Sequence, residues 1–99
     1  MKIDYNKLCD KYPKIPENTI YTICLYVNEG IPTGSFCEAV LINDFLGAFS
    51  RADEYNTQAM RHIAALVYND IPSNCHGSKY IYNNWISIGG LNKNQGTEQ

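Results

Sequence analysis

Apolar residues recur at the period of an α-helix in successive stretches of this chain, and glycine and proline separate the stretches. In residues 17–29 the apolar side chains occupy positions i, i+3, i+4 and i+7, which lie on one face of a helix. They are Ile20, Ile23, Cys24 and Val27. Gly30 is typical of the residue that ends a helix in the left-handed backbone conformation, and Pro32 prevents the helix from continuing. The pattern therefore predicts a helix from Glu17 to Glu29.

A second helix is predicted to begin at Ser35 and to continue to about Ser50. Ser35 and Glu38 have the spacing of a capping box, in which each side chain accepts a hydrogen bond from a backbone N–H at the helix start. The apolar stripe that follows consists of Cys37, Leu41, Phe45, Ala48 and Phe49. Asn43 and Asp44 would lie in the middle of this helix, where both residue types are unfavourable, so they need a further role.

Two more helices are predicted toward the C-terminus. Asp53 offers an N-cap for a third helix, which ends at Ile71-Pro72. Its apolar stripe is formed by Met60, Ile63, Ala64 and Val67. Residues 73–78 have the composition of a turn, and Ser78 can cap a short final helix that stops at Gly89-Gly90. The inward side chains of that helix are Ile81, Trp85 and Ile88.

Together these patterns predict an all-α protein, a small helical bundle of three main helices plus a short C-terminal helix. A chain of 99 residues is too short for two hydrophobic cores, so we expect a single domain over 1–99. Residues 1–15 form an N-terminal segment with a short helical turn near Tyr5 to Asp10. The helical core covers 16–88, and residues 91–99 form a flexible tail.

The composition excludes several classes of protein. An apolar fraction of 44% with 18% charged residues is typical of a globular chain. With 8 basic and 10 acidic residues and a net charge of −2, the chain lacks the basic surplus of DNA- and RNA-binding domains, so we expect no nucleic-acid partner. No apolar run approaches the roughly 20 residues of a membrane span, and no secretory signal is recognised, so we expect neither membrane association nor export.

Four cysteines, Cys9, Cys24, Cys37 and Cys75, are present without a C-x-x-C pair. Without a secretory signal we expect them to be reduced, in a cytosolic setting. Their spacing gives no tetrahedral ligand set, so neither a metal nor a cofactor is predicted. Cys75 is followed by His76, but neighbouring side chains on a turn diverge and no orienting acid is in view. We therefore expect no enzyme activity.

Several apolar and aromatic side chains lie away from the predicted stripes: Tyr21, Leu25, Tyr26, Phe36, Val40 and Leu46. Three short helices cannot bury all of this surface on one side. Leftover aromatic area on a small chain is typical of a partner surface, and a symmetric homo-oligomer is the simplest such partner. We therefore expect self-association.

The segment that runs from Ile31 to Phe36 is the first candidate binding site. It is a turn that leads into a predicted helix start, where free backbone N–H groups, the helix dipole and two hydroxyls converge. This arrangement suits a phosphate or carboxylate held by Thr33, Gly34, Ser35 and Phe36. The alternative is an ordinary loop whose Ser35 only caps a helix, since the segment lacks the Gly-Lys-Ser/Thr of a P-loop.

A second candidate site follows on the same predicted helix. Asp44 and Arg51 share one helix face at i, i+7, and Gly47 between them permits close approach. Together with Asn43 they present polar groups that suit the edge of a base or a ribose. The alternative is a buried polar bridge from Asn43-Asp44 to another part of the chain: Arg61, Asn56 or the 73–78 turn.

Two further clusters contribute amide and aromatic groups. Asn56 lies in the segment 51–56, which otherwise resembles a turn with an acidic cap. Tyr68 and Asn69 precede the turn of residues 72–78. Tyrosine rings supply stacking surfaces for bases, and amides can hydrogen-bond to their edges. The complete predicted ligand-binding set is Thr33, Gly34, Ser35, Phe36, Asn43, Asp44, Arg51, Asn56, Tyr68 and Asn69.

An ordered series of motifs, which spans about residues 16–86, resembles a group of small phage- and prophage-encoded proteins. The motifs are Ile31-Pro-Thr-Gly-Ser-Phe, Ala39-Val-Leu-Ile-Asn-Asp-Phe, Ala48-Phe-Ser-Arg-Ala-Asp-Glu-Tyr-Asn, Val67-Tyr-Asn-Asp-Ile-Pro and Cys75-His-Gly-Ser. Many members of this group carry Trp at the position of His76. The resemblance supplies no activity, but it implies a phage origin and action in the cytoplasm of a bacterial host.

A small acidic phage protein of this kind is expected to interfere with its host. We predict that it binds and sequesters a nucleotide-type second messenger of an anti-phage system without turnover, as small helical phage sponges do. Polar groups at many helix ends favour this prediction. One alternative is an inhibitor that acts through a protein–protein interface, as anti-CRISPR proteins do, using aromatics such as Tyr21, Tyr26 or Phe36. Another is a structural helical domain of a phage assembly.

Overall fold

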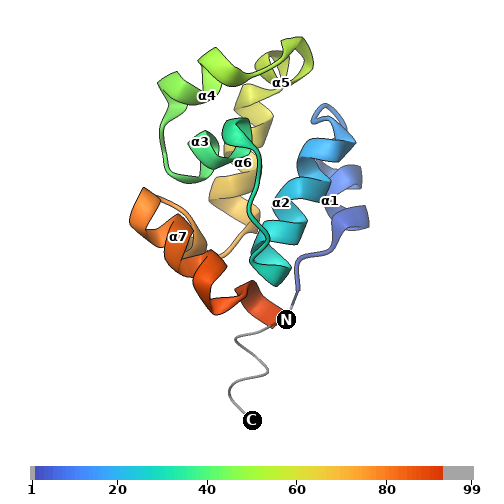
Figure 1. The fold of residues 1–99 in the computed structure, drawn as a ribbon. Helices are drawn as coiled ribbons and strands as arrows, with labels where there is room; N and C mark the ends of the chain where they lie inside the picture. The colour runs from blue at the N-terminus through green and yellow to red at the C-terminus, as the bar shows by residue number, and fades with distance from the viewer. Residues whose placement is uncertain (1, 93–99) are drawn as a thin grey trace.

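A computed structural model describes residues 2–92, and in this range all regular secondary structure is helical (Figure 1). The elements are α1 (Tyr5–Lys11), α2 (Glu17–Glu29), α3 (Ser35–Leu41), α4 (Phe45–Arg51), α5 (Glu54–Gln58), α6 (Met60–Asp70), the 3-10 helix η1 (Ser73–Cys75) and α7 (Lys79–Ile88). The predicted all-α class is confirmed. The predicted division into three main helices and a short one is wrong, because two of the predicted long helices are each broken in two.

The predicted first helix corresponds to α2, with the same bounds. Its buried side chains include the predicted stripe of Ile20, Ile23, Cys24 and Val27. Gly30 ends the helix in the left-handed conformation, with φ 69°, and its N–H donates to the carbonyl of Tyr26 at 2.8 Å.

The predicted helix over residues 35–50 is interrupted between Leu41 and Phe45. Asn43 has a positive φ of 69°, a conformation that asparagine tolerates better than most residues. The side chain of Asp44 accepts a hydrogen bond from the backbone N–H of Gly47 at 2.9 Å, so Asp44 is the N-cap of α4. The prediction that Asn43 and Asp44 lie inside a helix is therefore wrong, and their residue types suit the break.

The predicted capping box at the start of α3 is also wrong. The N-cap residue is Gly34, and no side chain caps this end of the helix. Ser35 is the first residue of the helix. The carboxylate of Glu38 instead forms an ion pair with Lys79 of α7. Glu38 therefore pairs with a lysine that is distant in the sequence, whereas the spacing predicted a backbone N–H at the start of its own helix.

The third predicted helix also consists of two helices. Asp53 caps α5 as predicted, since its side chain accepts a hydrogen bond from the backbone N–H of Asn56 at 2.7 Å. A break at Ala59 separates α5 from α6, which ends as predicted before Ile71-Pro72. Ser78 caps α7, as predicted.

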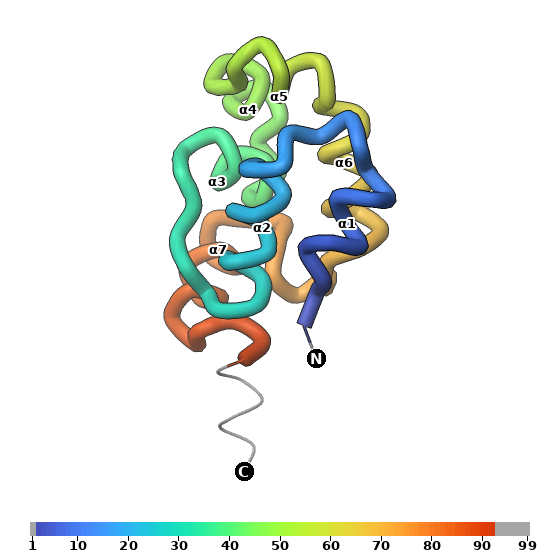
Figure 2. The backbone as a smooth tube through the Cα atoms, turned by 90° about the vertical axis from the view of Figure 1, so that its right-hand side faces the viewer, coloured from blue at the N-terminus to red at the C-terminus, as the bar shows by residue number. Residues whose placement is uncertain are grey.

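The N-terminal segment contains a full helix rather than a single turn. α1 lies beside α2 (Figure 2) and is tied to α6 by polar contacts. The ammonium group of Lys11 is 3.0 Å from a carboxylate oxygen of Asp70, and the hydroxyl of Tyr12 donates to the same carboxylate. The segment also contributes three buried side chains to the core: Leu8, Tyr12 and Ile15.

The core is organised around α2, which α1, α3 and α7 surround in the two views (Figures 1 and 2). Trp85 of α7 is 1% exposed, and its indole N–H donates to the carbonyl of Tyr26 at 3.0 Å. The hydroxyl of Tyr26 donates to the carbonyl of Cys75 at 2.7 Å. The Tyr26 ring stacks on that of Tyr82, with the ring centroids 5.0 Å apart.

The uncovered apolar surface is smaller than predicted. Tyr26 and Val40 were expected to lie outside the core, yet both are buried. The expectation is wrong for these residues because the helices of residues 2–92 enclose the core from more sides than three long helices would. Tyr21 and Leu46 are exposed, as expected.

The described chain ends shortly after α7. Residues 90–92 add one helical turn beyond Gly89, and residues 1 and 93–99 lie outside the described residues. Most of the tail predicted over 91–99 therefore falls outside them. Within residues 2–92 no helix combines the length and the apolar character that crossing a membrane requires.

Candidate functional site

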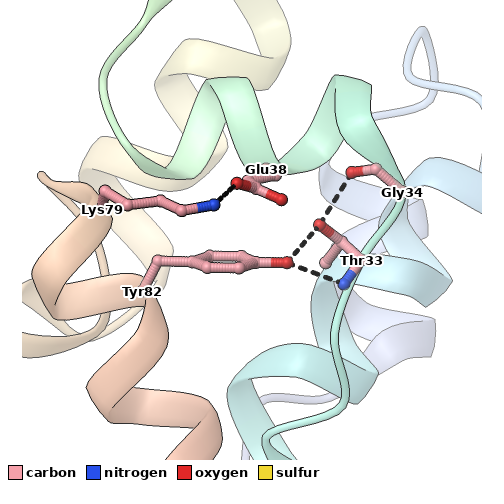
Figure 3. Close-up of polar contacts among 5 residues, drawn as sticks. All are labelled: Thr33, Gly34, Glu38, Lys79 and Tyr82. Atoms are coloured by element: carbon pink, nitrogen blue, oxygen red, sulfur yellow. Dashed lines mark hydrogen bonds and ion pairs between the residues drawn. The ribbon is translucent and has the colours of Figure 1, made fainter.

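Thr33, the first of the predicted ligand residues, makes its hydrogen bonds within the chain (Figure 3). Its backbone N–H donates to the hydroxyl of Tyr82 at 2.9 Å, and the two hydroxyl oxygens are 3.0 Å apart. The Thr33 hydroxyl also donates to the carbonyl of Gly34 at 3.0 Å. The helix that follows has only 7 residues whose peptide dipoles can add. These contacts favour the structural alternative for this loop.

An ion pair between α3 and α7 lies next to these hydrogen bonds. The Lys79 ammonium meets the Glu38 carboxylate beside the Thr33–Tyr82 contact (Figure 3). The Lys79 nitrogen also lies 5.6 Å from the centroid of the Tyr82 ring. These contacts connect α7 to α3 and to the loop before it, and the polar groups involved are paired with one another.

Gly34, Ser35 and Phe36 line a small depression of about 290 Å³ together with Asn56. Asn56 is only 8% exposed, and its side-chain oxygen accepts a hydrogen bond from the hydroxyl of Thr19 at 2.7 Å. This buried bond anchors α5 to α2. The structure thus brings four of the predicted residues together, but Asn56 already has a structural role.

Asp44 and Arg51 both lie beside Gly47, on the shared helix face that their spacing predicted. A Cβ atom on Gly47 would approach both side chains closer than 3.0 Å, so a larger residue there would require these two flexible side chains to move. With Ser35 they line a cavity of about 120 Å³. That volume is below the roughly 300 Å³ at which ligand pockets begin, so this cavity is too small for a nucleotide.

Asn43, Tyr68 and Asn69 line one larger pocket between α3, α4 and α6, of about 500 Å³. We call it the α6 pocket. Its other lining residues are Val40, Phe45, Arg61, Ala64, Ala65, Val67 and His76. The volume lies within the range of about 300–1,000 Å³ that is typical of small-molecule sites, and most of the lining is apolar. It is the strongest candidate site in the described part of the chain.

The polar and aromatic groups of the α6 pocket suit a planar anionic molecule. Tyr68 is 84% exposed and Phe45 is 38% exposed, so two aromatic rings are available for stacking. The exposed guanidinium of Arg61 is the one permanent charge among the lining residues. Asn43 and Asn69 are exposed and add amide donors and acceptors.

His76 and Cys75 have different environments, although they are adjacent. Partial burial lowers the pKa of His76, which therefore presents a neutral imidazole to the α6 pocket near pH 7. Burial raises the pKa of the Cys75 thiol to about 12, and its Sγ donates to the carbonyl of Pro72 at 3.1 Å. This thiol is protonated and enclosed, so it is poorly suited to act as a nucleophile.

Another depression, of about 620 Å³, lies between residues 13–18 and α5. Its charged side chains are Lys14, Glu17 and Asp53, so two carboxylates outnumber one ammonium group. This balance disfavours an anionic ligand, and none of the predicted ligand residues lies there. Within residues 2–92 no cluster of histidine, cysteine and acidic residues has the geometry of a metal site.

Phe45, Arg61 and His76 line the α6 pocket but were not among the predicted ligand residues. Phe45 was assigned to a core stripe, and Arg61 was considered only as a partner for Asn43-Asp44. The sequence nevertheless contained a signal for this pocket. Arg61 and Tyr68 are seven positions apart, with the small Ala64 and Ala65 between them. One helix face therefore carries a cation and an aromatic ring beside a shallow apolar strip.

Comparison with protein-family models, curated proteins and solved structures found no match to this chain. The assignment of a function therefore depends on the residues themselves. The α6 pocket combines a suitable volume with aromatic, cationic and amide groups.

Proposed function

We propose that this protein binds a nucleotide-type small molecule in the α6 pocket and retains it without chemical change. The observation that carries the proposal is the presence of Arg61, Tyr68 and Phe45 around one pocket of about 500 Å³. A base requires a stacking surface, and a phosphate requires a cation with several N–H donors. Phe45 and Tyr68 provide the stacking surface and Arg61 provides the cation, all in the lining of one pocket.

The amides extend this recognition to the edges of a base or sugar. Asn43 and Asn69 each carry two N–H donors and one carbonyl acceptor, which match the mixed donors and acceptors of a base edge. The lining contains no carboxylate, and its one imidazole is held neutral. These features favour binding over hydrolysis of a phosphate ester.

Sequestration in a bacterial host is the role that we propose for such binding. The resemblance to small phage-encoded proteins suggests the setting, and the ligand would be a nucleotide second messenger of an anti-phage system. A protein that removes a messenger by binding must hold it tightly and be present in excess over it. We therefore expect affinity in the nanomolar to low micromolar range, equivalent to about −12 to −8 kcal/mol.

Mass spectrometry of the protein purified from bacterial cells tests the proposal directly. A native spectrum followed by denaturation of the same sample should release a nucleotide-sized molecule. Calorimetric titration with mononucleotides and cyclic dinucleotides then measures affinity. Arg61→Ala should weaken binding about 10- to 100-fold, because a charge-assisted hydrogen bond contributes about 1.5–3 kcal/mol. Arg51→Ala, which lies outside the α6 pocket, is the matched control and should change affinity less than about 3-fold.

A second candidate function is inhibition of a host protein through an apolar interface. The observation in its favour is that Leu46 and Phe49 are 84% and 51% exposed on α4. This candidate predicts that no nucleotide binds and that Arg61→Ala is silent. It also predicts that Leu46→Glu abolishes capture of a host protein.

A further inference from the structure

One side of α4 leaves three apolar side chains in contact with solvent. Phe45, Leu46 and Phe49 are 38%, 84% and 51% exposed. The opposite side of the helix packs against α3, with Ala48 fully buried. Figure 1 shows α4 at the upper edge of the molecule, beside α5. Contiguous exposed apolar patches of this kind often mark sites of interaction with another surface.

This surface continues across the α6 pocket to Tyr68, since Phe45 and Tyr68 line the same pocket. We call the set of Phe45, Leu46, Phe49 and Tyr68 the apolar face. With about 150–250 Å² for a whole aromatic side chain, its exposed parts amount to roughly 450 Å². A standard interface buries about 800 Å² per partner, and about 65% of a homodimer interface is apolar, which is about 520 Å² of apolar surface per partner. The apolar face therefore has close to the apolar area that one half of such a dimer requires.

The charges around α4 also favour a second copy of the chain as the occupant. α4 and its cap carry one carboxylate, Asp44, and one guanidinium, Arg51, so this helix has no net charge beside the apolar face. A partner with a strong charge of either sign would find no complement on α4. A copy of this chain brings the same α4 surface without net charge, and a net charge of only −2 over the whole chain, which opposes association weakly.

We propose that two copies of this chain pair about a two-fold axis through the apolar face. Because Phe45 and Tyr68 belong both to this face and to the α6 pocket, the second copy covers the mouth of the pocket. Leu46, the most exposed of the three apolar side chains on α4, lies at the contact. The pairing does not require a bound ligand, so it is tested separately from the proposed function.

Sedimentation velocity of the full chain at about 5–500 μM tests the pairing. The wild-type mass should be twice the 11.2 kDa of one chain. Leu46→Glu should give the mass of a single chain, because it places a carboxylate in the apolar contact. The matched control is Tyr80→Glu, which changes a side chain of similar exposure, 79%, on α7 outside the face and should stay dimeric. Circular dichroism checks that both variants are folded.

Nitration of tyrosine by tetranitromethane locates the contact. Tyr68 and Tyr80 have exposed fractions of 84% and 79%, so they should react at similar rates in a single chain. In the wild-type dimer Tyr68 should react at least 5-fold more slowly than Tyr80, and in Leu46→Glu the two rates should converge. A monomeric wild type at every concentration, a dimeric Leu46→Glu variant, or equal nitration of both tyrosines in the wild-type dimer would each overturn the proposal.

Discussion

Replacing Tyr82 by Phe removes one hydroxyl and keeps the ring, so it isolates the contact between α7 and the loop before α3. The ring is 3% exposed and lies nearly parallel to that of Tyr26, with 12° between the planes. Phenylalanine preserves this stacking. The change removes only the two contacts of the hydroxyl with Thr33, at 2.9 Å and 3.0 Å.

The expected loss is about 1–2 kcal/mol of the free energy of unfolding. A hydrogen bond contributes about 1 kcal/mol net, and a buried donor left without a partner costs about 1–3 kcal/mol. Thr33 is half-buried, so water can reach its N–H in part and keeps the loss toward the lower end. For a domain of this size, 1 kcal/mol corresponds to about 4–8 °C in Tm. The variant should therefore melt about 4–16 °C below the wild type.

Thermal and urea denaturation followed by circular dichroism measure this loss. Tyr80→Phe on the same helix is the control and should change stability by less than about 0.5 kcal/mol, because Tyr80 is exposed. The Thr33→Val variant combined with Tyr82→Phe completes a double-mutant cycle and should show coupling of at least about 0.5 kcal/mol. Equal stability of the two phenylalanine variants, or additive effects in the cycle, would refute a structural role for Thr33.

Three further predictions follow from single positions. Gly30→Ala should lower the free energy of unfolding measured in urea by at least about 2 kcal/mol. Gly30 has a left-handed backbone conformation, and a Cβ there would lie 2.8 Å from the backbone that follows α7. The control Gly34→Ala has open space around it and should be nearly neutral. Burial lowers the pKa of His76, so the unfolded chain binds its proton more readily. The free energy of unfolding should therefore fall as the pH drops below about 6.5, and His76→Gln should flatten this pH dependence. Burial raises the pKa of Cys37 to about 12, so iodoacetamide should label it far more slowly than the half-buried Cys9; equal labelling in the folded protein would contradict this account.

The elements that were predictable from the sequence are those whose signals lie within a few residues. α2 has a stripe of four apolar positions and a glycine stop, and both act within one helix. Asp53 and Ser78 each bind a backbone N–H three residues ahead, so their capping roles depend only on neighbours. Neither feature needs information about the rest of the fold.

The end of α3 was not predictable in this way, because distant residues stabilise it. The carbonyl of Leu41 accepts a hydrogen bond at 2.7 Å from the N–H of Gly77, which follows η1. The side chain of Glu38 pairs with Lys79, which is also distant in the sequence. The apolar pattern continues from Leu41 to Phe45 as if the helix were unbroken. Periodicity alone therefore could not reveal the break.

This break also explains why the candidate site differs from the predicted one. In an unbroken helix Phe45 would follow Leu41 by one turn and would share its burial, which is complete. The positive φ of Asn43 and the cap at Asp44 redirect the chain, so that Phe45 is 38% exposed and lines the α6 pocket with Tyr68. Asn43 and Asp44 were predicted to contact a ligand. The structure places Asp44 in the turn that gives the α6 pocket one of its walls, and Asn43 both forms that turn and lines the pocket.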